Sequence, residues 1–389
     1  MNQTNQPVII LGAGIGGLAV AAALLQKKVD VVVVEQAAKF ARIGAGIQMT
    51  PNAVRVLDGL GIRHVLDSHA FAPKSSLNRD YRGEITNEFP LAEHALERYG
   101  MPFYAMHRAD LHTALDRLVP NEKKILGKKV IDIVEHDDGV ELFFADGTTM
   151  RGQQLIAADG VHSPVRDKIF GASAPQYTGR VAYRTTFPRS QLKGFDIGDS
   201  RTKWWGKDRH IVIYYVTKNK DEVYFVTSQP EDAAWMTPES WSSKGDVQEL
   251  RDAYAEFHGD VRAVLNACDD VYKWAIFKRD PLPNWVSRRI VLLGDACHPM
   301  TPYMAQGAAM ALEDAVVLSR CYTDSGLTDF QAIGQLFEAI RKPRCSAVQA
   351  GAEANNWMKN KTNPDWVYGY NAWDIALSPD SGSNPHFLP

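Results

Sequence analysis

Residues 8–35 constrain the fold of this chain more than any other part of the sequence. They read as a short apolar strand, a glycine-rich turn, an alanine- and leucine-rich helix and a second apolar strand that ends on Glu35. The turn matches the pattern G-x-G-x-x-G at Gly12, Gly14 and Gly17. In such a turn the first glycine permits a tight bend, the second lets the backbone approach a pyrophosphate, and the third lets the helix pack closely on the strand. The sequence therefore predicts a Rossmann-like unit that binds a dinucleotide.

The two ends of this unit have separate expected roles. Phosphates would lie against the free N–H groups and the positive dipole at the helix N-terminus. Glu35 would accept hydrogen bonds from the ribose hydroxyls of an adenosine. The alternative is a glycine-rich turn that binds nothing. Such a turn does not require the strand, helix, second strand and acid that occur here in this order.

Composition argues against several classes of function. The 389 residues suffice for two or three domains, or for one large domain with an inserted sheet. The net charge of −3 shows no bias toward nucleic acid or a membrane surface, and no apolar run reaches the ~18–20 residues needed to span a bilayer. We expect a soluble cytoplasmic protein without a signal peptide, with neither a nucleic-acid nor a membrane partner. The four cysteines lack C-x-x-C spacing and indicate reduced thiols and no metal site: Cys268, Cys297, Cys321 and Cys345.

Two further strand ends carry a glycine beside an acid. The apolar run 155–158 precedes Asp159 and Gly160, and the run 289–293 precedes Gly294 and Asp295. A dehydrogenase that uses NAD or NADP needs no further nucleotide contacts spread along the chain. The three sites together therefore argue against a simple dehydrogenase, which stays an alternative on the first motif alone.

Residues 180–280 differ in character from the rest of the chain. Their strand-like segments are rich in aromatic and β-branched residues, and their alternation predicts an antiparallel sheet with one face buried. Amphipathic patterns predict helices at 246–258 and 261–267. An inserted sheet beside a nucleotide-binding fold would supply one wall of a substrate pocket. The segments are 181–187, 203–205, 210–217 and 222–228.

The three motifs together resemble those of single-component, FAD-dependent aromatic hydroxylases related to salicylate and 4-hydroxybenzoate hydroxylases. Family members combine a G-x-G-x-x-G, a DG motif and a GD motif, which stand here as GAGIGG at 12–17, DGVHSPVR at 159–166 and GDACHPMTP at 294–302. The resemblance covers nearly the whole chain and is closest to the 6-hydroxynicotinate 3-monooxygenase branch. The segments that carry this likeness are 203–205, 208–210, 214–215, 222–227 and 366–370.

The resemblance implies an α/β fold with a Rossmann-like FAD-binding domain, an inserted antiparallel β-sheet substrate domain and C-terminal helices. Residues 1–179 would form the first part of the FAD-binding domain, with some substrate-domain strands near 66–105. Residues 180–280 would form the substrate domain, and 281–361 would return to the FAD-binding domain with the GD motif and the C-terminal helices. Residues 362–389 are expected to form an irregular tail.

The resemblance also implies which residues hold FAD. The ADP half would lie against the glycine turn and Glu35, with Arg42 near a phosphate and Arg108 reaching the flavin pyrophosphate. Asp295 would contact the ribityl chain. Asp159 belongs to a fingerprint associated with both FAD and reduced pyridine nucleotide, and it could equally cap the following helix. The full predicted set is Gly12, Gly14, Gly17, Glu35, Arg42, Arg108, Asp159, Gly160, Gly294, Asp295 and Gly307.

The implied reaction uses NADH or NADPH to reduce FAD, which reacts with O2 to give a C4a-hydroperoxyflavin that oxygenates an electron-rich ring carbon. The implied substrate is a small aromatic acid, a hydroxylated pyridine- or benzene-carboxylate, with a 6-hydroxynicotinate-like compound favoured. Carbon dioxide would leave if a carboxylate sits on the attacked carbon. A salicylate- or hydroxybenzoate-type hydroxylase is the alternative, and an NAD(P) dehydrogenase or a flavin-binding module without catalysis is more remote. A monomer or a homodimer is expected.

The predicted substrate pocket combines strand residues with the turn after the GD motif. By strand alternation His210 and Tyr214 share a face, whereas Tyr215 points away. Tyr214 and Tyr224 offer hydroxyls to a ring substituent or carboxylate, and His210 can exchange a proton near neutral pH. Backbone N–H groups of the turn 299–307 would stabilise developing negative charge.

Gln48 and Tyr303 stand at positions where the resemblance to the 6-hydroxynicotinate 3-monooxygenase branch implies histidine. Gln48 can hydrogen-bond a ring nitrogen or hydroxyl but cannot act as a base, and Tyr303 could orient the substrate or deprotonate it only through a relay. A related hydroxylated pyridine or benzoate therefore stays open as the substrate. The predicted catalytic residues are His210, Tyr214, Tyr303 and Gln48, and the substrate-binding set adds Tyr224, Pro302 and Met304. No metal is expected.

Overall fold

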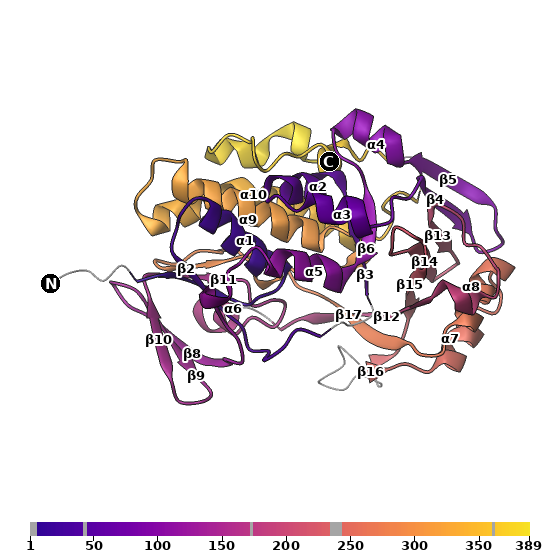
Figure 1. The fold of residues 1–389 in the computed structure, drawn as a ribbon, viewed down its shortest axis with the longest axis horizontal. Coiled ribbons are helices and arrows are strands. Elements are labelled where there is room, and N and C mark those ends of the chain that lie inside the picture. The colour runs from indigo at the N-terminus through magenta and orange to yellow at the C-terminus, as the bar shows by residue number, and fades with distance from the viewer. Residues whose placement is uncertain (1–5, 42–44, 172–173, 234–242, 360–361) are drawn as a thin grey trace.

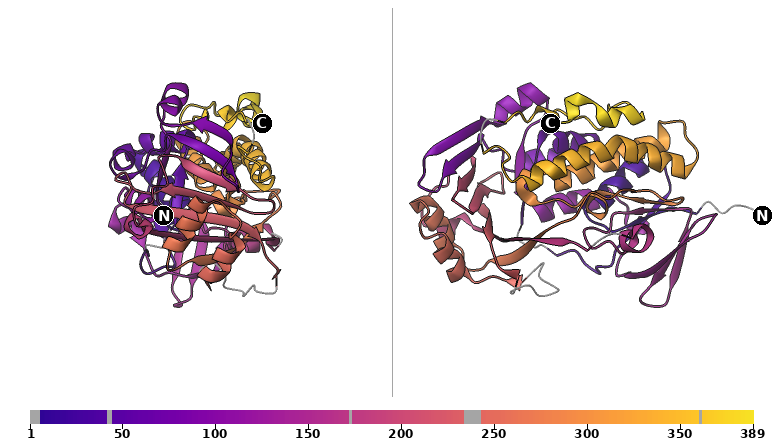
Figure 2. Two further views of the ribbon diagram at one scale, coloured as in Figure 1. Left: turned by 90° about the vertical axis from the view of Figure 1, so that its right-hand side faces the viewer. Right: turned by 180° about the vertical axis from the view of Figure 1, so that it is seen from behind.

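The computed structural model describes residues 6–41, 45–171, 174–233, 243–359 and 362–389. A helix-covered parallel sheet forms one end of the elongated molecule, and a larger, mainly antiparallel sheet forms the other (Figure 1). Figure 2 shows from the side and from behind that the C-terminal helices lie over the parallel-sheet end. The predicted α/β class with an additional sheet is confirmed.

The five-stranded sheet has the order β18-β11-β1-β2-β7, and every pairing in it is parallel. Both faces of such a sheet are covered, so its strands read as continuous apolar runs, as in the four valines of β2. The carboxyl ends of β1, β2, β11 and β18 lie at one edge, which brings the three glycine-acid turns together. The strands are β1 (Val8–Leu11), β2 (Val31–Val34), β7 (Lys124–Ile125), β11 (Gln154–Ala157) and β18 (Ile290–Leu292).

Helices α1, α5, α9 and α10 lie on one side of this sheet, and a three-stranded sheet lies on the other (Figure 1). Helix α1 packs against α9, and α9 packs against α10. No helix in the described part of the chain has the length and apolar character needed to cross a membrane. The elements are α1 (Ile15–Gln26), α5 (Arg108–Asp116), α9 (Gly307–Thr323), α10 (Phe330–Glu353), β8 (Val130–Glu135), β9 (Val140–Phe144) and β10 (Thr149–Gly152).

The eight-stranded sheet has the order β16-β17-β12-β15-β14-β13-β4-β5. It recruits β4 and β5 from the segment 66–105, as predicted. One pairing, β13 with β4, is parallel, so the expectation of a purely antiparallel sheet is wrong at that position. The strands are β4 (Ser75–Asp80), β5 (Ile85–Pro90), β12 (Gln176–Pro188), β13 (Arg201–Trp205), β14 (His210–Tyr215), β15 (Glu222–Pro230), β16 (Ser243–Lys244) and β17 (Tyr272–Lys278).

Both faces of β14 are buried, so the expectation that one face of this sheet is open is also wrong. One face packs on a cluster that includes α7 (Val247–Ala253) and α8 (Gly259–Ala267), and Tyr254 at the end of α7 donates to the His210 carbonyl at 2.9 Å. The other face contacts Tyr303 from the FAD-binding part. Helix α7 ends at Ala253, five residues before the predicted end, because a turn follows at Tyr254.

The C-terminal tail is more ordered than predicted. It contains α11 (Asp365–Tyr368) and two short 3-10 helices, and Trp366, Tyr368 and Tyr370 are buried. The proposed domain boundaries at 179, 280 and 361 stay a prediction. The remaining helices and strands are α2 (Pro51–Gly59), α3 (Arg63–His69), α4 (Ala92–Tyr99), α6 (Pro164–Phe170), β3 (Gly46–Met49) and β6 (Tyr104–His107).

Candidate active site

The glycine turn has the geometry that its sequence predicts. Gly12 has φ +100°, and a Cβ there would collide with the carbonyl of Ala158. A Cβ on Gly17 would overlap the Gly12 carbonyl oxygen, so this helix can approach the turn only with glycine at that position. A Cβ added to Gly14 would point into open space in front of the N-terminus of α1. That opening is where a phosphate would reach the helix N–H groups.

Glu35 lies beside this turn, at the carboxyl end of β2. One carboxylate oxygen accepts from the Ala13 N–H at 2.8 Å, and the other accepts from the Ala37 N–H at 2.7 Å. Each oxygen keeps a further acceptor site for a ribose hydroxyl. Arg42, which the sequence assigned to a phosphate, lies outside the described residues.

The DG and GD turns are neighbours because β11 pairs with β18. Arg166 joins them: this buried side chain donates to the Ala296 carbonyl at 3.1 Å and to the Val161 carbonyl at 2.8 Å. Ser163, and not Asp159, is the N-cap of α6, because its hydroxyl accepts from the Arg166 N–H. Arg166 was quoted within the DG motif, but its bridging role was missed.

Asp159 accepts from the Val165 N–H of α6 at 3.4 Å through Oδ2, which leaves Oδ1 for another role. Burial raises the pKa of its carboxyl to about 6, although nearby hydrogen bonds oppose the rise. Its Oδ1 is buried without a hydrogen-bond partner in the described part of the chain. A buried acceptor without a partner is costly, so a ligand hydroxyl or amide donor would satisfy it.

Asp295 and the N-terminus of α9 face each other across the GD turn. Asp295 is exposed, yet desolvation by the surrounding protein raises the pKa of its carboxyl. A Cβ built on Gly307, the first residue of α9, would lie only 3.9 Å from Asp295 Oδ1. Gln306 precedes that helix and makes no side-chain cap, so the first N–H groups of a long helix stay available to an anion.

A network of buried charged side chains on α9 and α10 packs under the GD turn and hydrogen-bonds to it. Asp314 of α9 accepts from the Gly294 N–H at 3.1 Å, from His298 Nε2 at 2.5 Å and from Arg341 Nε at 2.7 Å. Burial would raise the pKa of Asp314, but the charges of His298 and Arg341 outweigh it and lower that pKa to about 2. Cys297, His298 and Asp314 have ligand atoms within 4.8 Å of one another. Because Asp314 is already paired with Arg341, we interpret this group as an ion-pair network.

The predicted pocket residues meet on one face of the eight-stranded sheet. We call this face, which contacts Tyr303, the inner face; the opposite face packs on α7 and α8. The Tyr214 and Tyr224 rings lie 5.1 Å apart, and Tyr214 also hydrogen-bonds Gln48. The His210 and Tyr303 rings lie 5.6 Å apart. Burial raises the pKa of both Tyr214 and Tyr224, so both hydroxyls stay protonated and can donate. Tyr215 points away and donates to Asp196 at 2.9 Å, as the alternation predicts.

The side chains of residues 302–304 point to three different surroundings in the structure. Pro302 is exposed, and Tyr303 faces Ser228, whose hydroxyl is 3.0 Å from its own. Met304 is buried against Gly351 of α10 and belongs to the core of the FAD-binding part, so the structure does not bring it to the tyrosines. The exposed Arg108 is close enough to Asp295 and Arg184 to influence the pKa values of both.

Four cations that share this inner face were not recognised from the sequence. Arg201 and Lys203 are two residues apart on β13, and Arg180 and Arg184 are four residues apart on β12, so each pair lies on one face of its strand. Lys203 is 2% exposed, with its ammonium 3.8 Å from the centre of the Trp205 ring, and the Arg184 guanidinium lies 3.6 Å from that of Trp274. The detectable signal was a pair of basic residues at even spacing on each of these two strands, which puts both members of a pair on one face.

These cations surround His210 without a carboxylate. Burial, followed by the charges of Lys203, Arg180 and Arg201, lowers the pKa of His210 well below its usual value. Burial, followed by Arg201, Lys359 and Arg180, likewise lowers the pKa of Lys203. Among the described residues no carboxylate pairs with Arg184, Arg201 or Lys203. The arrangement favours binding of an anion.

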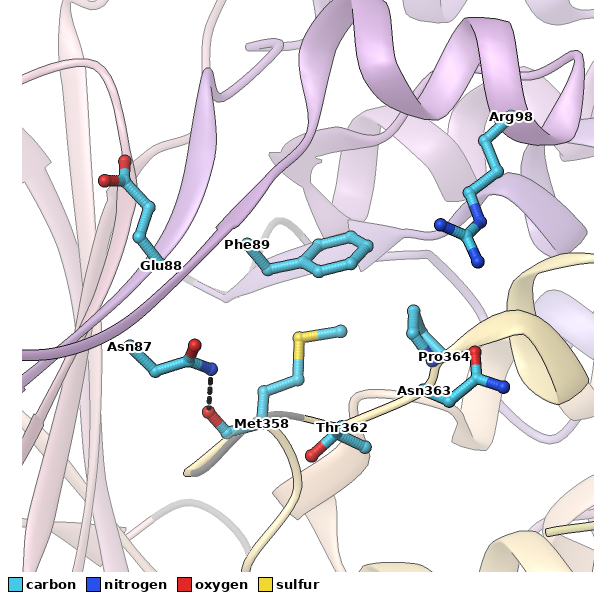
Figure 3. A pocket seen from close by; sticks show the side chains of 8 residues that line it. All are labelled: Asn87, Glu88, Phe89, Arg98, Met358, Thr362, Asn363 and Pro364. Atoms are coloured by element: carbon cyan, nitrogen blue, oxygen red, sulfur yellow. Dashed lines mark hydrogen bonds between the residues drawn. The ribbon is translucent and has the colours of Figure 1, made fainter.

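A cavity of about 650 Å³ lies at the outer edge of the same sheet (Figure 3). Figure 3 shows Asn87 of β5 donating to the carbonyl of Met358 at 3.1 Å, with the Phe89 ring and the Met358 side chain facing one another. The next residue, Lys359, has its ammonium 5.2 Å from the centre of the Trp205 ring. No residue predicted for the site lines this cavity.

Comparison with known proteins identifies relatives over nearly the whole chain. The family described as "FAD binding domain" matches residues 5–322. The 6-hydroxynicotinate 3-monooxygenase of Bordetella bronchiseptica is 41% identical over 378 residues, which are 96% of this chain and 98% of that protein. The enzyme of the same name from Pseudomonas fluorescens is 38% identical over 95% of this chain and 96% of that protein.

Solved structures show the same architecture. A salicylate hydroxylase substrate complex superimposes with a TM-score of 0.81 at 25% identity, covering 95% of this chain and 97% of that one. HpxO of Klebsiella pneumoniae, solved with FAD and uric acid, gives a TM-score of 0.80 at 29% identity, covering 91% of this chain and 88% of that one.

Proposed function

Because this chain belongs to the FAD binding domain family and is a flavoprotein aromatic monooxygenase, we propose that it hydroxylates a hydroxylated pyridine- or benzene-carboxylate. NADH or NADPH is the proposed reductant, and O2 supplies the oxygen atom. We also propose a cytoplasmic location, since NAD(P)H is an intracellular reductant and all four cysteines are free thiols.

The residues at the edge of the parallel sheet fit FAD. The open space at Gly14, the Glu35 carboxylate and the uncapped N-terminus of α9 suit a pyrophosphate flanked by sugar hydroxyls. The Oδ1 of Asp159, which has no partner among the described residues, and the exposed carboxylate of Asp295 offer acceptors to further hydroxyls. Bound there, the flavin supplies the activation of O2 and the transfer of oxygen to the ring.

One observation carries the choice of an acid as substrate: the cations around His210 have no carboxylate partner among the described residues. Burying unpaired cations is costly, and an anionic ligand relieves that cost. A carboxylate on an aromatic ring supplies the anion, and the apolar and aromatic surfaces of the same face accept the ring.

The ring hydroxyl has separate proposed partners. Tyr214 and its neighbour Gln48 form one hydrogen-bonding pair, and Tyr303 and Ser228 form another. His210 is uncharged at neutral pH, because its pKa is lowered, and its neutral ring can therefore accept a hydrogen bond from the substrate hydroxyl. A hydrogen bond accepted from the hydroxyl increases the negative charge on the ring oxygen. The oxygen then donates more electron density to the ring, and the ring carbon reacts more readily with an electrophilic oxygen.

A hydroxybenzoate is the second candidate substrate. The relative named 3-hydroxybenzoate 6-hydroxylase 1 from Aquipseudomonas alcaligenes is 35% identical over 80% of this chain. Gln48 and Tyr303 also replace the two histidines that the resemblance to 6-hydroxynicotinate 3-monooxygenase implies. The proposal therefore covers both ring types and favours the pyridine because of the higher identity.

The test is a screen of hydroxypyridine and hydroxybenzoate acids with the purified yellow protein, following NADH and NADPH oxidation together with product mass. A productive acid should accelerate reductant oxidation and yield a product that contains one additional oxygen, or one that has exchanged a carboxylate for a hydroxyl. A protein that does not retain FAD, or that oxidises no member of either series, would refute the proposal.

A further inference from the structure

A single row of side chains crosses the inner face of the eight-stranded sheet. Strand register places Arg184 opposite Val226, Val226 opposite Val212, and Val212 opposite Lys203. The row therefore has a cation at each end and two valines between them. Three strand spacings of ~4.8 Å separate the end residues, about 14 Å between their backbones.

The two valines form an apolar floor of the size of an aromatic ring. Val226 is only partly buried and packs beside Tyr303, whereas Val212 is buried. The rows on either side carry polar groups: Tyr214 and Tyr224 on one side, His210 and Ser228 on the other. A ring on the floor would thus meet hydroxyl partners along its sides and a cation at each end.

Neither end cation pairs with a carboxylate among the described residues. Lys203 faces the Trp205 ring, and the charges that act on it come from Arg201, Lys359 and Arg180, which are all cations. Arg184 stacks on Trp274 and contacts the neutral Tyr224, and its Nε is buried without a partner among the described residues. Because the Lys203 ammonium lies over Trp205 of β13 and the Arg184 guanidinium lies over Trp274 of β17, the two charges lie toward opposite ends of the row, where separate carboxylates can meet them. The ring hydroxyl already has Tyr214, Gln48 and the Tyr303–Ser228 pair.

We propose that the substrate is a hydroxylated aromatic ring with two carboxylates at opposite edges, one held by Lys203 with Arg201 and the other by Arg184. This inference rests on the proposed function and names the class of acid within it. Lys203 and Arg184, at the two ends of the row, would make the enzyme specific for a diacid.

The first experiment compares matched acids on the FAD-loaded enzyme. The probes are 2-hydroxybenzene-1,4-dicarboxylate with 2-hydroxybenzoate and 3-hydroxybenzoate, each of which lacks one carboxylate of the diacid. A parallel set is 6-hydroxypyridine-2,5-dicarboxylate with its two monoacids. Because a charge-assisted contact is worth about 1.5–3 kcal/mol, the diacid of one set should bind roughly 10- to 100-fold more tightly than either monoacid. Binding is read from the perturbed flavin absorption and from kcat/KM.

The second experiment locates each carboxylate. Lys203→Met should weaken diacid binding to the level of one monoacid and leave that monoacid within a few-fold of its wild-type affinity. Arg184→Met should do the same with the other monoacid. Lys207→Met, at an exposed position of the turn between β13 and β14, is the matched control and should change neither. FAD content and thermal unfolding confirm that each variant is folded.

The outcomes separate the two proposals. If a monoacid binds and turns over as well as its diacid, the diacid inference is wrong and the hydroxylase function stands. If both variants weaken monoacids and diacids equally, Lys203 and Arg184 do not each hold a separate carboxylate. If no acid perturbs the flavin or stimulates NAD(P)H oxidation, the proposed function itself fails.

Discussion

Asp314 and Arg341 form an ion pair with 2.7 Å between carboxylate and guanidinium, and both side chains are fully buried. The Asp314 carboxylate also accepts a hydrogen bond from the Gly294 N–H. The ion pair therefore fixes the position of the GD turn. The pair therefore links the interior of two helices to the place where the flavin is expected to bind.

Arg341→Met should destabilise the protein by about 3–5 kcal/mol, because it removes the cation that the buried carboxylates of Glu313 and Asp314 share. FAD should also be lost more readily, since the GD turn loses its support. Denaturant unfolding of the FAD-loaded enzyme and its FAD content are the measurements. The control is Lys244→Ala, which removes an exposed pair with Asp270 and should cost at most about 1 kcal/mol. Wild-type stability of the Arg341 variant would contradict the role given to the network.

Asp159 should make the FAD-free protein less stable as pH rises from about 4 to 6. Its folded pKa, about 6, lies above the usual value near 3.9, so in this window the folded state binds more protons than the unfolded state. Stability is then fully present below pH ~4 and is lost as pH rises through 6, by about 1–2 kcal/mol after allowance for partial exposure. Asp159→Asn should remove this contribution. An unchanged difference between pH 4 and pH 7 in that variant would show that another group is responsible.

Gly14 and Gly17 should respond differently to alanine. A Cβ at Gly14 meets no atom within 4 Å, so Gly14→Ala should leave the FAD-free protein at least as stable as the wild type. It should nevertheless raise the FAD dissociation constant, about tenfold for 1.4 kcal/mol of lost contact, because the methyl group occupies the phosphate's approach. Gly17→Ala should lower stability by about 1–3 kcal/mol through overpacking against the Gly12 carbonyl. Equal effects of the two variants on FAD and on stability would argue against this division of roles.

Tyr214→Phe should lower kcat/KM for the best acid by roughly 10- to 100-fold, since one hydrogen bond to an ionised or ionising ring oxygen is lost. FAD should stay bound. Tyr215→Phe is a close control, because Tyr215 is the next residue, faces away from the pocket and bonds Asp196. It should cost about 1 kcal/mol of stability and leave the kinetics unchanged. The pocket assignment fails if the two variants have the same kinetics.

The nucleotide-binding half was predictable because each of its signals is local. Gly12, Gly14 and Gly17 adjoin the strand and helix that they connect, and Glu35 ends the next strand, so spacing alone places them together. The strand alternation that separates Tyr214 from Tyr215 is equally local.

The positions of the cations on the inner face of the eight-stranded sheet were not predictable in the same way. Arg184 and Lys203 come to one row only through the pairing of β12, β15, β14 and β13, and the order of those strands is not encoded in any short segment. The parallel pairing of β13 with β4 likewise depends on a contact between distant parts of the chain.

The charges beneath the GD turn were missed for another reason. Glu313, Asp314 and Arg341 look like the polar residues of surface helices, but α9 is covered on nearly all sides by α1, α2 and α10. Met304 shows the opposite error: it follows Tyr303 in the predicted pocket turn, and the turn directs it into the core.

The central claim is that this flavoprotein inserts one atom of O2 into an aromatic acid. The most direct measurement is the mass of the hydroxylated product formed from NAD(P)H under ¹⁸O₂, with a parallel reaction in H₂¹⁸O under unlabelled O2. The account predicts one ¹⁸O atom in the new hydroxyl from labelled O2 and none from labelled water. A hydroxyl that takes its oxygen from water, or reductant oxidation that proceeds without O2, would contradict it.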